Sequence, residues 1–88
     1  MSHPLGPLAD NLTAYAIYAT AQSEMRHAYT LIESGDFLAA ATEIDSAAQA
    51  AETLARVSKP VDKNRYQHWQ RVVLARRQFA SRARAQAA

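Results

Sequence analysis

Residues 31–41 of the chain read LIESGDFLAAA, and this stretch decides the fold. Gly35 interrupts a run of strong helix formers and takes the left-handed cap conformation without strain, so it is expected to end one helix. Asp36 follows at once and can cap the next helix through its carboxylate. Because the break between them is so short, the two helices are predicted to run antiparallel.

Apolar side chains mark both helices. Before Gly35 they recur at three- and four-residue steps from Leu8 to Ile32, which predicts a helix over residues 7–34 with Pro7 in its first turn. After Gly35 the apolar stripe consists mostly of alanine and predicts a helix over residues 37–57. Since small side chains let backbones approach closely, this second helix should lie in the middle of the molecule.

Pro60 cannot continue a helix, and Asp62 is the next residue suited to an N-cap. A third amphipathic stripe predicts a helix over residues 62–84. The 88 residues are therefore expected to form one all-α domain. Its architecture is predicted as a three-helix antiparallel bundle, or as an extended helical hairpin with a third helix beside it.

The first turn also carries a family resemblance. Residues 35–37, followed by Ala40, Ile44 and Ala47, resemble the hairpin of the tetratricopeptide repeat over about 25 residues. In that family a Gly-Asp-Tyr turn precedes small and large residues at these spacings. The chain departs from the family at Glu24 and Glu52, where the repeat carries tryptophan and proline. Long helices and a third helix also resemble the microtubule-interacting-and-transport domain, which implies binding of short helical peptides in grooves between helices.

Charge is distributed unevenly along the chain. Residues 1–58 carry two basic and seven acidic side chains, whereas residues 59–88 carry eight basic side chains and one acidic side chain. The two parts therefore have net charges of −5 and +7, which together give the +2 of the whole chain. Either the third helix neutralises the first two, or it presents a basic docking surface to an acidic partner.

Several classes of function have no support in the sequence. The chain has no cysteine, and His3, His27 and His68 stand far apart without a metal-binding motif. No glycine-rich phosphate loop or nucleophile motif occurs, so neither an enzyme nor a cofactor is expected. No apolar stretch is long enough for a membrane span, and the lack of cysteine fits a reducing, cytoplasmic location.

The remaining interpretation is a non-catalytic protein–protein interaction module, acting as an adaptor, an assembly factor or an inhibitor that occupies a surface. Its partner would be another protein or a nucleoprotein complex. The small size fits an inhibitor from a phage or mobile element, such as an anti-CRISPR protein. The alternative is nucleic-acid binding through the basic third helix. Candidate contact residues are the aromatic and basic side chains Tyr66, Trp69, Arg71, Arg76 and Arg77.

Two further features leave alternatives open. Arg76 lies on the apolar side of the third helix, so it is expected either to pair with Asp45 or Glu43 or to extend its charged end past the edge of the core. The first helix carries tyrosines and Met25 beyond what a narrow seam needs. They are interpreted as core residues or as part of a homodimer seam or a groove for a partner.

Overall fold

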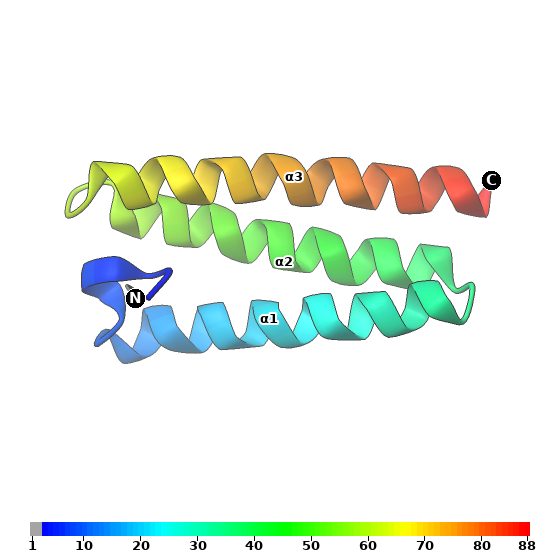
Figure 1. Cartoon of the computed structure of the whole chain (residues 1–88), viewed down its shortest axis with the longest axis horizontal. Coiled ribbons are helices and arrows are strands. Elements are labelled where there is room, and N and C mark those ends of the chain that lie inside the picture. The colour runs from blue at the N-terminus through cyan, green and yellow to red at the C-terminus, as the bar shows by residue number, and fades with distance from the viewer. Residues whose placement is uncertain (1–2) are drawn as a thin grey trace.

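The chain turns back on itself twice in the computed structural model, which describes residues 3–88. A short 3-10 helix, η1 (Gly6–Leu8), precedes α1 (Leu12–Glu33), α2 (Phe37–Ser58) and α3 (Lys63–Ala87). Figure 1 shows α2 between α1 and α3 and antiparallel to both. No strand occurs in the described part of the chain. The predicted all-α, three-helix antiparallel bundle is confirmed.

Both predicted turns form through local hydrogen bonds. Gly35 adopts a φ of 82°, and the N–H of Asp36 donates to the Leu31 carbonyl at 2.8 Å, which closes the end of α1. The carboxylate of Asp36 accepts from the N–H of Ala39 at 3.3 Å and caps α2. At the second turn Asp62 Oδ1 accepts from the N–H groups of residues 64 and 65 and caps α3.

The helices differ from the predicted ones most clearly at the start of α1 and at the end of α3. The first helix begins at Leu12 rather than at residue 7, because Asn11 Oδ1 accepts from the N–H of Ala14 at 3.0 Å. Pro7 lies instead in the separate η1. The third helix continues to Ala87 rather than ending at 84, since the alanines there favour helix.

Alanines let α2 approach both neighbours closely. The close backbone contacts join α1 to α2 and α2 to α3, so α2 lies in the middle, as predicted. The buried side chains of α2 are mainly small, namely Ala40, Ala41, Ala47, Ala48, Ala51, Ala55 and Ser58, with Ile44 and Leu54 as the large ones. Helices α1 and α3 meet mainly through aromatic rings. Tyr18 packs against Trp69 with ring centroids 6.1 Å apart, and Tyr29 against Phe79 at 5.9 Å.

Residues 3–9, here called the N-terminal segment, fold across one end of the bundle (Figure 1). Leu5 is completely buried in a core cluster that includes Leu54 of α2 and Trp69 of α3. The ring of His3 lies 5.1 Å from that of Tyr18, between centroids. Gly6 has a φ of 57°, and a Cβ there would lie 2.7 Å from Arg65 Nε of α3. The segment thus joins α1 to α3.

Candidate functional site

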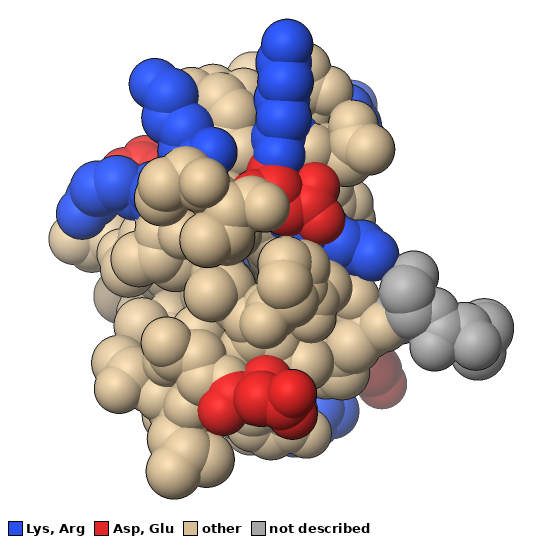
Figure 2. Space-filling view, turned by 90° about the vertical axis from the view of Figure 1, so that its left-hand side faces the viewer, with Lys and Arg blue, Asp and Glu red and all other residues tan. Residues whose placement is uncertain are grey.

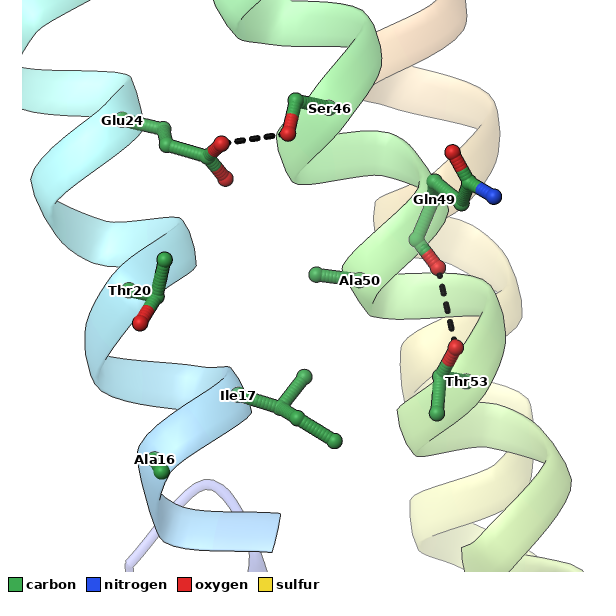
Figure 3. Close-up of a pocket in the computed structure, with 8 residues that line it drawn as sticks. All are labelled: Ala16, Ile17, Thr20, Glu24, Ser46, Gln49, Ala50 and Thr53. Atoms are coloured by element: carbon green, nitrogen blue, oxygen red, sulfur yellow. Dashed lines mark hydrogen bonds between the residues drawn. The ribbon is translucent and has the colours of Figure 1, made fainter. Parts of the chain in front are cut away.

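Each pair of helices leaves a surface depression, and the one between α1 and α2 has a volume of about 400 Å³. Figure 3 shows the Glu24 side chain reaching across from α1 to accept a hydrogen bond from Ser46 Oγ of α2. Thr53 Oγ1 donates to the Gln49 carbonyl at 3.3 Å within α2. Three polar residues of this depression, Glu24, Ser46 and Thr53, are thus already hydrogen-bonded, and Ile17 is its one large apolar lining residue.

The depression between α2 and α3 carries charges of both signs. Glu52, Arg56 and Lys59 line it together with Tyr66 and Val73. The Lys59 ammonium lies 5.3 Å from the centroid of the Tyr66 ring, which is cation–π distance. Gln70 Nε2 donates to the Tyr66 hydroxyl at 2.9 Å, so the Tyr66 side chain is contacted by two other lining residues.

The charged residues that line the third depression, the α1–α3 groove, are all basic. It has a volume of about 420 Å³ and is lined by Gln22, Met25, Arg26, Tyr29, Val72, Ala75, Arg76 and Phe79. A smaller hollow of about 140 Å³ continues it past Phe79, lined by Ile32, Phe37, Ala83, Gln86 and Arg82. No carboxylate lines either part.

Arg76 forms part of the floor of this groove. Its side chain is partly buried, and Nη1 donates to the carbonyl oxygen of Ala47 on α2 at 2.8 Å. Burial lowers the pKa of the guanidinium, because the charged form loses hydration. Within residues 3–88 no carboxylate lies within ion-pair distance of Arg76. A helical carbonyl can accept this second bond because it has two lone pairs.

Of the two alternatives for Arg76, the pairing with Asp45 or Glu43 is therefore wrong. Asp45 instead accepts hydrogen bonds from Arg77, the next residue of α3, and from Arg84, about two helical turns farther along. Glu43 lies against His27 of α1, with 3.5 Å between Oε2 and Nδ1. Both candidate carboxylates thus have other partners, and Arg76 is left with a neutral acceptor.

Arg77 belongs to an ion-pair network on the opposite side of α3 from the groove. Its guanidinium contacts Asp45 Oδ1 at 3.1 Å and Glu52 Oε1 at 2.9 Å. The hydrogen bond from Arg84, followed by that from Arg77, lowers the pKa of the Asp45 carboxyl, although partial burial opposes them. The hydrogen bond to Glu52 is the main reason that the pKa of Arg77 is raised. Part of the positive charge of α3 therefore neutralises α2, as one of the two interpretations held.

Trp69 is not accessible to a partner, because only 3% of its surface is exposed. It packs between Tyr18 and His68, and its indole N–H has no hydrogen-bond partner among the described residues. Burial, with help from the positive charge of Arg65, lowers the pKa of His68. The interpretation of Trp69 as a contact residue thus conflicts with its place in the core.

The five predicted contact residues do not converge on one surface. Arg76 lies in the α1–α3 groove, Tyr66 lines the depression between α2 and α3, and Trp69 is in the core. Arg77 is held by two carboxylates. Arg71 is exposed and forms no side-chain hydrogen bond or ion pair with another described residue. Only Arg76 of the five lines the groove.

Val72 and Phe79 lie on the apolar stripe of the third helix and also line the groove. Both are only partly buried, because α1 and α3 are too far apart to cover them completely. The signal that pointed toward the groove was the surplus of tyrosine and methionine on the first helix. Met25 is partly buried in the groove, and Tyr29 is 50% exposed at its edge.

Among residues 3–88 no three side chains with His, Cys, Asp or Glu chemistry are grouped so as to hold a metal ion. No described helix combines the length and the apolar character that crossing a membrane requires. Searches against protein-family models, curated proteins and solved structures return no match to this chain. The resemblance to the tetratricopeptide hairpin and to the microtubule-interacting-and-transport domain therefore stays a prediction.

Proposed function

We propose that the chain is a non-catalytic protein-binding module that holds a helical segment of a partner in the α1–α3 groove. One observation carries this proposal. The seam between α1 and α3 is filled by the chain's own N-terminal segment at one end and left open over Met25, Tyr29, Val72 and Phe79.

The two parts of this seam are continuous. His3 of the N-terminal segment packs on Tyr18, and the Tyr18 hydroxyl accepts a hydrogen bond from Gln22 Nε2 at 3.4 Å. Gln22 is the first residue of the open groove. At the end of the seam that the N-terminal segment covers, an apolar residue of that segment, Leu5, is buried against the helices. The same packing is available to an external segment farther along.

A helix suits the open part better than an extended chain. The groove runs between α1 and α3, which both pack antiparallel to α2. A helix bound in the groove would contact both of them and complete a four-helix arrangement. From Gln22 to Ile32 the α1 backbone rises about 15 Å, which corresponds to about three helical turns. A partner helix would insert apolar side chains at three- and four-residue steps over Met25, Tyr29 and Phe79.

The proposal covers an adaptor, an assembly factor and an inhibitor alike, since each works by occupying a surface. An anti-CRISPR role stays a prediction from size alone. Nucleic-acid binding through α3 is the less favoured alternative, because Asp45 and Glu52 bind Arg77, and Asp45 also binds Arg84. A mobility-shift assay with duplex DNA and RNA should show no salt-sensitive complex if this ranking is right.

The test uses two exposed alanines of α3, one in the groove and one outside it. Ala75→Arg places a long side chain across the groove, whereas Ala85→Arg adds the same side chain at a residue that lines neither the groove nor its continuation. A photo-cross-linking amino acid at position 75 should capture a discrete protein in the source organism, and one at position 85 should not. Recovery of that protein with purified chain should be lost in Ala75→Arg and kept in Ala85→Arg. A partner that Ala75→Arg retains would show that binding occurs elsewhere.

A further inference from the structure

The charges of the α1–α3 groove indicate which kind of helix it binds. This inference rests on the function proposed above. Arg26 and Arg76 line the groove and Arg82 lines its continuation, while no lining residue is acidic. The other two depressions include Glu24 and Glu52 among their lining residues. The charged residues that line the groove and its continuation are therefore all basic.

Arg76 has donors to spare in this groove. A guanidinium presents five N–H groups, and the bond from Nη1 to the Ala47 carbonyl is the one hydrogen bond that Arg76 makes with the described residues. Its charge is partly buried, and no carboxylate of the described residues lies within ion-pair distance, although Glu24 is near enough to favour the charged form. Burial without a contacting countercharge is unfavourable for a cation. A ligand carboxylate would supply the missing countercharge and accept two parallel hydrogen bonds from one guanidinium.

A second copy of the chain is poorly suited to supply that carboxylate. Six of the eight acidic side chains are already engaged, as caps or as partners of serine, histidine or arginine, namely Glu24, Asp36, Glu43, Asp45, Glu52 and Asp62. The other two, Asp10 and Glu33, lie near opposite ends of α1 and cannot form one row along a helix. A different protein is therefore better suited than a second copy of the chain to occupy the groove.

We infer that the groove takes an acidic amphipathic helix of another protein, with one carboxylate of that helix paired to the Arg76 guanidinium. The apolar face of the helix contacts Met25, Tyr29 and Phe79, and its acidic residues flank that face. Arg26 lies on the α1 side of the groove, where its Nη2 donates to Ser23 Oγ at 3.0 Å. Arginines on both sides thus select against basic helices.

The experiment uses three stapled 14-residue helical peptides that share leucine anchors on one face. Their flanking positions carry glutamate in the first, glutamine in the second and lysine in the third. Binding to the full chain is followed by amide chemical shifts, which report the site, and by fluorescence anisotropy, which reports affinity. We expect the glutamate peptide to shift Met25, Tyr29, Val72 and Phe79 and to bind at least tenfold more tightly than the glutamine peptide. The lysine peptide should bind most weakly.

Arg76→Gln should reduce the preference for glutamate to within about threefold and leave the affinity for the glutamine peptide nearly unchanged. Arg56→Gln is the matched control, because it removes an exposed arginine of α2 that lies outside the groove. It should keep the full preference. The spectrum and melting temperature of Arg76→Gln show whether it folds, and Arg26→Gln provides a second groove variant with an exposed side chain.

The outcomes separate the two proposals. Equal binding of the glutamate and glutamine peptides in the groove would overturn the inference and leave the protein-binding function standing. Shifts confined to the α1–α2 surface, or no shifts with any peptide at millimolar concentration, would overturn both. A stable dimer of the free chain that buries the groove residues would also overturn the inference, because the occupant would then be a second copy.

Discussion

Leu5 should contribute far more to stability than its place near the start of the chain suggests. Its side chain is completely buried among residues of all three helices, whereas Leu12, seven positions later, is 86% exposed. Truncating a buried leucine to alanine typically costs about 2.7–5 kcal/mol in transfer and cavity terms. The N-terminal segment can detach locally, which limits the loss, so we expect about 2–3 kcal/mol for Leu5→Ala.

For a domain of this size each kcal/mol corresponds to a fall of about 4–8 °C in melting temperature, so Leu5→Ala should lower it by roughly 10–20 °C. Leu12→Ala is the matched control and should change stability by less than about 0.5 kcal/mol. Urea unfolding followed by circular dichroism and by the fluorescence of Trp69, the one tryptophan, gives both values. If the two variants have the same stability, the segment does not complete the core.

Three further predictions concern charge and backbone. Because hydrogen bonds from its arginine partners lower the pKa of Asp45, the stability they provide is present at neutral pH and should be lost as pH falls below about 4; unfolding of wild type and Asp45→Asn should converge there. Burial lowers the pKa of His68, so its imidazole should titrate below the ordinary 6.5 when followed by NMR. Because the unfolded chain then takes up this proton at a higher pH than the folded chain, the free energy of unfolding should decrease as pH falls below about 6.5. Gly35→Ala should cost about 1–2 kcal/mol because of its left-handed φ alone, since nothing lies near its added Cβ. Gly6→Ala should cost more, since its Cβ would also meet a side chain of α3.

The sequence was sufficient for the architecture because its signals are local. Gly35 and Asp36 form the first turn through their own backbone and side-chain bonds, and Asp62 does the same at the second. An apolar stripe likewise shows which residues share a face. It does not show how completely that face is covered, which depends on the distance between two helices that are not neighbours in sequence.

That limit explains what could not be predicted about the site. Trp69 and Phe79 lie on the same stripe, yet the first is buried and the second is partly open, because the N-terminal segment covers only one end of the seam. Nothing periodic marks Leu5 as a core residue. The group that accepts the hydrogen bond from Arg76 is a backbone carbonyl. Every residue has such a carbonyl, so the sequence does not mark this one, and charge pairing suggested acidic side chains instead.

The alanine face of α2 also determines where the molecule can change over evolutionary time. Positions such as Ala40, Ala47 and Ala51 are completely buried between two helices, so a larger side chain would force α1 and α3 apart. Substitutions there should be selected against whatever the partner is. The walls of the α1–α3 groove come from the two outer helices and are less constrained. Related chains would therefore be expected to keep the small-residue spine while altering the groove, and with it the partners they accept.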